Sequence, residues 1–156
     1  MPAPSELIAS YLAGPAQLRA AVSGLTRDQL TARPVAGKWS VLEVVAHIAD
    51  FEPVYADRIR RVIALDRPLL LAADENDYVT RLGYHDREVD EELAMIEATR
   101  KSTARVLRSA PAEAWQRVGI HSYKGLQTLE QVVTAITNHI PHHLGFVAEK
   151  RKALGV

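Results

Sequence analysis

The chain contains no cysteine. This absence excludes disulfide bonds, thiolate metal ligands and a cysteine nucleophile, and it suits a reducing compartment. If the protein carries out chemistry at sulfur, the sulfur atom must therefore come from a second molecule.

Long hydrophobic runs are also missing. No uninterrupted apolar stretch approaches the roughly 18 residues that a transmembrane helix needs. The N-terminal segment contains Glu6 and has no cluster of basic residues, unlike a secretory signal peptide. We therefore expect a cytoplasmic protein with no membrane partner.

An excess of charge of either sign is absent as well. Lys+Arg and Asp+Glu both number 19, so the formal net charge is zero. A protein built mainly to bind nucleic acid usually carries a basic surplus, so we expect no DNA or RNA as the main partner. A neutral chain also has little electrostatic protection against self-association.

What is present is the composition of an ordinary globular protein. Hydrophobic residues make up 47% of the 156 residues and charged residues 24%. A chain of this length can bury a sizeable core. The sequence shows no internal repeat or linker, so we expect a single domain over residues 1–156.

Apolar residues recur with helical period in four long segments. The expected helices begin near residues 4, 40, 88 and 128, and the last three end near residues 65, 109 and 154. Four amphipathic helices in one small chain predict an all-α four-helix bundle. A short helix or turn is expected around residues 25–30.

Capping boxes mark the starts of two of these helices. In each, a hydroxyl residue is followed three positions later by Glu or Gln, as in Ser40–Glu43 and Thr128–Gln131. Prolines interrupt the helical pattern, and we expect Gly14-Pro15 to kink or split the first helix.

Two segments carry weaker signals. Residues 66–87 are the least regular stretch, and we expect a long loop with at most one helical turn. Residues 119–125 are also expected to form a loop, preceded by a short turn in which Trp115 packs as an anchor.

The chain has six histidines, and their positions on the predicted helices separate them. His139 and His143 lie one turn apart, on the apolar seam of the last helix. His142 points about 100° away from that seam. His47 lies at the border of the buried stripe of the second helix. Two imidazoles from one helix and one from another are a common way for a bundle to bind a metal ion.

Neutral imidazole suits zinc, nickel, copper and iron. Three protein ligands would leave coordination positions for water or substrate, as in catalytic metal sites. The alternative is a pair of core histidines that bond to carbonyls or waters, and spacing alone leaves both interpretations open.

The motifs around these histidines resemble those of the DinB-like, or YfiT-like, superfamily. The similarity covers almost the whole chain in order, with residues 66–120 similar only in outline. The opening pattern comprises Leu25-Thr26, Leu30, Pro34, Gly37-Lys38-Trp39-Ser40, His47, Asp50 and Glu52; the closing pattern comprises Gly125, Thr128-Leu129 and the segment from His139 to Gly145.

The resemblance implies an up-down-down-up bundle with a long crossover. It also implies a metal site formed by His47, His139 and His143, with nickel or zinc as the usual ion. Members of the superfamily include S-transferases that use a low-molecular-weight thiol such as bacillithiol, mycothiol or glutathione, and proteins described as metal-dependent hydrolases. Homodimers are frequent among them. Pro141 lies between the paired histidines, and a bend there would open or distort the site.

Other polar residues have two interpretations each. Asp50 is one turn from His47 and could orient its ring or accept a proton, or it could be a solvated carboxylate. Arg100 could meet an anionic substrate, but we expect a surface position. His85 and His121 are expected to be ordinary surface residues, although His121 could approach the open end of the site.

Three functions remain open. A metal-dependent S-transferase would activate a low-molecular-weight thiol cosubstrate for attack on a small-molecule substrate. A metal-dependent hydrolase would activate water instead. A non-catalytic module would bind only a metal ion or a small ligand.

Overall fold

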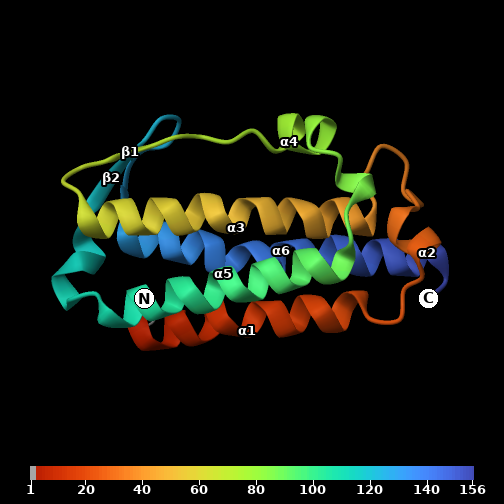
Figure 1. Cartoon of the computed structure of the whole chain (residues 1–156), viewed down its shortest axis with the longest axis horizontal. Helices are drawn as coiled ribbons and strands as arrows, with labels where there is room; N and C mark the ends of the chain where they lie inside the picture. Colours follow the sequence, from red (N-terminus) through yellow and green to blue (C-terminus); the bar gives the residue numbers. More distant parts are fainter. Residues whose placement is uncertain (1–2) are drawn as a thin grey trace.

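Four long helices run side by side in the computed structural model, which describes residues 3–156 (Figure 1). They are α1 (Pro4–Val22), α3 (Val41–Ala64), α5 (Val89–Ser109) and α6 (Leu129–Leu154). The smaller elements are α2 (Arg27–Thr31), β1 (Leu69–Leu70), α4 (Glu75–Arg81), η1 (Tyr84–Asp86), η2 (Ala112–Gln116), β2 (Val118–His121) and β3 (Gly125–Thr128). The single domain over 1–156 stays a prediction, since Met1 and Pro2 lie outside the described residues.

The bundle has the expected up-down-down-up order. In Figure 1, α1 runs from left to right, α3 and α5 both run from right to left, and α6 returns to the right. Helices α1 and α3 each pack against both α5 and α6. The parallel pair α3 and α5 requires a long crossover, and residues 65–88 pass back along α3 to supply it. This crossover carries α4 over the N-terminal half of α3 (Figure 1).

Side-chain caps set the starts of α3 and α6 as predicted. The Ser40 hydroxyl accepts from the Glu43 backbone N–H, and the Glu43 carboxylate accepts from the Ser40 N–H. Thr128 and Gln131 repeat the arrangement at α6. Each box satisfies backbone donors that the first helical turn leaves free.

Prolines do not interrupt the helices. Pro15 lies within α1, so of the two expectations at Gly14-Pro15, a kink or a split, the split is wrong. Pro141 lies within α6, and that helix also continues past it. Tertiary packing of the apolar face outweighs the lost backbone hydrogen bond at each position.

A small three-stranded sheet takes up most of residues 119–125, expected to be a loop, and only residues 122–124 form a turn. Strand β2 pairs antiparallel with β3 and parallel with β1. A side chain at Gly119 would collide with Leu70, so glycine permits the close contact between the two strands. The crossover also contains more structure than one turn, since α4 and η1 follow β1.

A buried polar network links all four long helices. Arg100 of α5 is fully buried, so the surface position expected for it is wrong. Its guanidinium donates to Glu52 of α3 at 2.7 Å, to the Tyr11 carbonyl of α1 at 2.6 Å and to the Ile136 carbonyl of α6 at 3.0 Å. The Tyr11 hydroxyl donates to the second Glu52 oxygen. The network fixes α3 and α6 relative to each other close to the predicted site.

None of the helices in the described part of the chain is both long enough and apolar enough to cross a membrane.

Candidate metal centre

Three imidazoles from two helices converge between α3 and α6. The Nε2 atom of His139 lies 2.9 Å from Nε2 of His47 and 3.1 Å from Nε2 of His143. One nitrogen from each ring falls within a mutual distance of 4.8 Å. The structure therefore brings together the three histidines that the sequence predicted, despite Pro141 between two of them.

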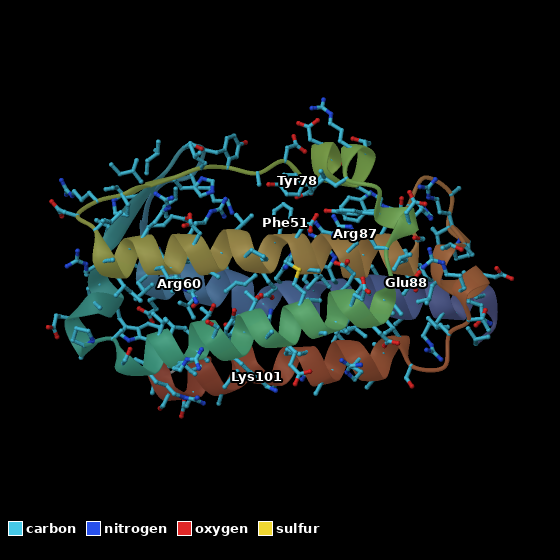
Figure 2. All side chains as sticks on the ribbon, viewed as in Figure 1. Phe51, Arg60, Tyr78, Arg87, Glu88 and Lys101 are labelled. Carbon is cyan, nitrogen blue, oxygen red and sulfur yellow. The ribbon has the colours of Figure 1, made fainter. Side chains whose placement is uncertain are left out.

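Helix geometry and aromatic packing position the rings. His139 and His143 are four residues apart on α6, so they share one face of the helix. The His47 ring packs against Phe51 at 4.5 Å and against Trp39 at 5.2 Å between ring centroids. Above Phe51, Tyr78 of α4 packs on the same side of α3 (Figure 2). These contacts hold the His47 ring toward α6.

All three rings are neutral at ordinary pH. Burial lowers the pKa of His47 to about 4 and, together with the neighbouring imidazoles, lowers the pKa of His143 to about 3 and of His139 to about 2. A neutral imidazole presents one lone pair, which is the form that binds a metal ion.

The donor set fits a divalent metal ion. Two nitrogens bound to one ion at the usual Zn–N distance would lie roughly 3.3 Å apart in a tetrahedral site, close to the separations observed here. Nδ1 of each ring is buried and has no hydrogen-bond partner within residues 3–156. Two buried imidazoles and one partly buried imidazole with so few partners would be costly on their own, and a shared cation would satisfy the three facing Nε2 atoms together.

The Asp50 carboxylate is bound to Arg87. Its two carboxylate oxygens accept hydrogen bonds from the Arg87 guanidinium at 2.7 and 2.9 Å. Arg87 also contacts Glu92, and it lies where the crossover meets α5 (Figure 2). In this structure Asp50 thus ties the crossover to α3, and it makes no hydrogen bond to His47 among the described residues.

The remaining histidines lie outside the triad. His142 is exposed beside it, as the helical angle predicted. His121 is buried in β2 and accepts from two backbone N–H groups, so its expected surface position is wrong. His85 contacts the buried Glu43, which also binds Arg33. Glu43 therefore does more than cap α3.

A cavity of about 460 Å³ opens beside the triad. It is lined by Gly37, Lys38, Trp39, Val44, Glu75, Asn76, His142, Phe146 and Lys150 together with the three histidines. The sequence alone did not identify Lys150 as a residue of the site. It lies seven residues after His143 and therefore on the same face of α6. That spacing was the available signal.

Comparisons with known proteins show the family of the chain and agree with its fold. The model of the DinB superfamily matches residues 11–147. A protein of Geobacillus thermodenitrificans, provisionally named a metal-dependent hydrolase, is 27% identical over 151 residues, which cover 96% of this chain and 85% of that protein. YfiT of Bacillus subtilis, which carries the same provisional name, is 25% identical over 142 residues, covering 90% of this chain and 80% of YfiT.

The solved structure of Bacillus subtilis YfiT has the same fold. It superposes with a TM-score of 0.91 at 24% identity, covering 97% of this chain and 87% of YfiT. It is described as a probable metal-dependent hydrolase with an unusual four-helix bundle topology. The chain belongs to the DinB superfamily, and its relatives are described as metal-dependent enzymes.

Proposed function

We propose that this protein is a metal-dependent S-transferase that binds one divalent ion, nickel or zinc, through His47, His139 and His143. The convergence of three neutral imidazoles beside an open cavity carries the proposal. Such an ion supplies Lewis acidity, which lowers the pKa of a thiol or of water. Three neutral ligands leave its full charge available for that effect.

The surroundings of the triad favour a thiol over water. A thiol has a pKa of about 8.5 and ionises with modest help, whereas water starts near 15.7 and depends more on a proton acceptor. The carboxylate nearest to His47 along α3, Asp50, is occupied by Arg87. Because the chain has no cysteine, a low-molecular-weight thiol would enter as a cosubstrate.

In this reaction the thiol sulfur would form a bond to an electrophilic carbon of the small-molecule substrate. The leaving group would depart with its bonding electron pair, and the thiol proton would pass to solvent. Trp39 and Phe51, packed against the His47 ring, would shield one side of the site from water.

A metal-dependent hydrolase is the second candidate. The names given to the relatives favour it. Glu75 of α4 also lines the cavity, and its carboxylate could accept a proton from water.

Turnover assays on the full-length protein, with its metal content measured, separate these functions. The protein is incubated with an alkyl halide in the presence and absence of glutathione, bacillithiol or mycothiol, and with an ester in the absence of thiol. The S-transferase predicts a thioether product that needs both the thiol and the metal ion. Ester cleavage without thiol would favour the hydrolase, and no turnover by the metal-loaded protein would favour a non-catalytic binding module.

We also propose a cytoplasmic homodimer. The zero net charge and the apolar side chains exposed on and beside the small sheet, Leu69, Leu71, Tyr123 and Leu126, support self-association. Light scattering of the purified chain measures the oligomeric state, and a mass of one chain would contradict the dimer.

A further inference from the structure

Lys150 is a buried lysine without a carboxylate partner. Only 2% of the residue is exposed, although it lines the cavity beside the triad. Its ammonium donates to the Phe146 carbonyl at 3.3 Å and lies 5.7 Å from the centre of the Phe146 ring. It forms no ion pair within the described residues. Lysine is rarely buried to this extent unless it is paired.

A second lysine adds to the positive charge of the cavity. Lys38 lines the same space and is close enough to disfavour the charged form of Lys150. Burial is the largest effect, and it lowers the pKa of the Lys150 amine. An anion bound between Lys38 and Lys150 would offset both the burial of the Lys150 ammonium and its repulsion by Lys38.

The acidic residues nearby offset this charge only in part: Glu149 and Glu43 favour the charged form of Lys150, but neither forms an ion pair with it among the described residues. Glu43 already binds Arg33, His85 and the Ser40 N–H. Glu149 is exposed and does not line the cavity. Glu75 is the one carboxylate in the lining, so Lys38 and Lys150 leave one net positive charge beside the neutral triad.

Apart from Asn76, the rest of the lining is apolar or aromatic. Trp39, Val44 and Phe146 contribute to the wall. A space of about 460 Å³ can hold a small molecule with a ring or short chain. The cavity thus combines an apolar wall, one net positive charge and three facing imidazoles.

We infer that the cavity selects a small carboxylate with an apolar body, and that Lys150, assisted by Lys38, binds the carboxylate while the rest of the molecule reaches the triad. This inference names a substrate class for the proposed function and rests on it for the reaction. The lysine site itself does not depend on a bound metal ion.

Calorimetry with benzoate and benzamide tests the inference, because these probes share shape and differ in charge. Each is titrated into the full-length protein as purified and into the variants Lys150→Met and His143→Ala. Lys152→Met is the matched control, since Lys152 is exposed on α6 and does not line the cavity. Elemental analysis of every variant follows the metal site separately.

The wild-type chain is expected to bind benzoate more tightly than benzamide, with a dissociation constant lower by about tenfold or more. A hydrogen bond to a charged group changes a dissociation constant by about this factor. Lys150→Met should remove most of this preference without changing the metal content, and Lys152→Met should keep it. Lys150→Met should also raise the melting temperature, because an unpaired buried charge is replaced by an apolar chain of similar length.

The His143→Ala variant separates the two proposals. A preference for benzoate that persists without bound metal supports the lysine site, whatever becomes of the proposed reaction. A preference that disappears with the metal and survives in Lys150→Met would overturn the inference, as would equal binding of benzoate and benzamide by the wild-type chain.

Discussion

The Arg100 guanidinium lies 2.6 Å from a carboxylate oxygen of Glu52, and both side chains are completely buried. Because Arg100 also binds the Ile136 carbonyl, this pair joins α3 and α6. His47 lies five residues before Glu52, and His139 lies three residues after Ile136. The pair therefore holds the two halves of the histidine triad in register.

Loss of Arg100 should strongly destabilise the protein. Arg100→Met leaves the Glu52 carboxylate buried without its cation, and we expect a loss of about 3–5 kcal/mol in the free energy of unfolding. Denaturant unfolding measures the change. Lys101→Met is the control, because Lys101 pairs with Glu97 at the surface and should change stability by at most about 1 kcal/mol. A double variant with Glu52→Leu should recover much of the loss, and equal effects of Arg100→Met and Lys101→Met would contradict this role.

The metal-free protein should lose stability as the solution becomes acidic. The folded pKa values of His47, His139 and His143 lie below the ordinary 6.5, so the unfolded chain takes up protons first. The contribution of the neutral rings to the free energy of unfolding is complete above about pH 6.5, and it is lost as the pH falls toward 4 and below. Urea unfolding of chelator-treated protein between pH 4 and 8 measures it. His143→Ala should show a shallower dependence, and an unchanged slope would count against buried neutral rings.

Asp50 should matter for the crossover and not for metal binding. Asp50→Asn weakens the ion pair with Arg87, and we expect it to reduce stability by about 1–2 kcal/mol. Its metal content should stay at the wild-type value, because Asp50 makes no hydrogen bond to the triad among the described residues. Hydrogen exchange of residues 75–88, compared with the rest of the chain, would locate the loosening. Metal loss in this variant with the crossover unchanged would instead show that Asp50 supports the histidines.

Local signals in the sequence predicted much of the fold and the site. The capping boxes at Ser40 and Thr128 depend on residues three positions apart, and both were confirmed. The pairing of His139 with His143 depends only on helical period. These features are visible in sequence because the interacting groups are close neighbours along the chain.

The features that were missed depend on distant partners. Strand β1 exists because Leu69 and Leu70 pair with Ile120 and His121, about fifty residues later. Arg100 is buried because Glu52, 48 residues away, supplies its counter-charge. Helical period places Arg100 between Ile96 and Thr103 near the inner stripe of α5, but no local pattern shows the counter-charge that allows an arginine to be buried there.

Elemental analysis of the purified, untagged protein tests the metal site most directly. The wild-type chain and the exposed-neighbour control His142→Ala should each carry about one nickel or zinc ion per chain, and His143→Ala should carry almost none. Absence of metal from the wild-type chain even after reconstitution, or full retention by His143→Ala, would contradict the site and leave three buried polar histidines in its place.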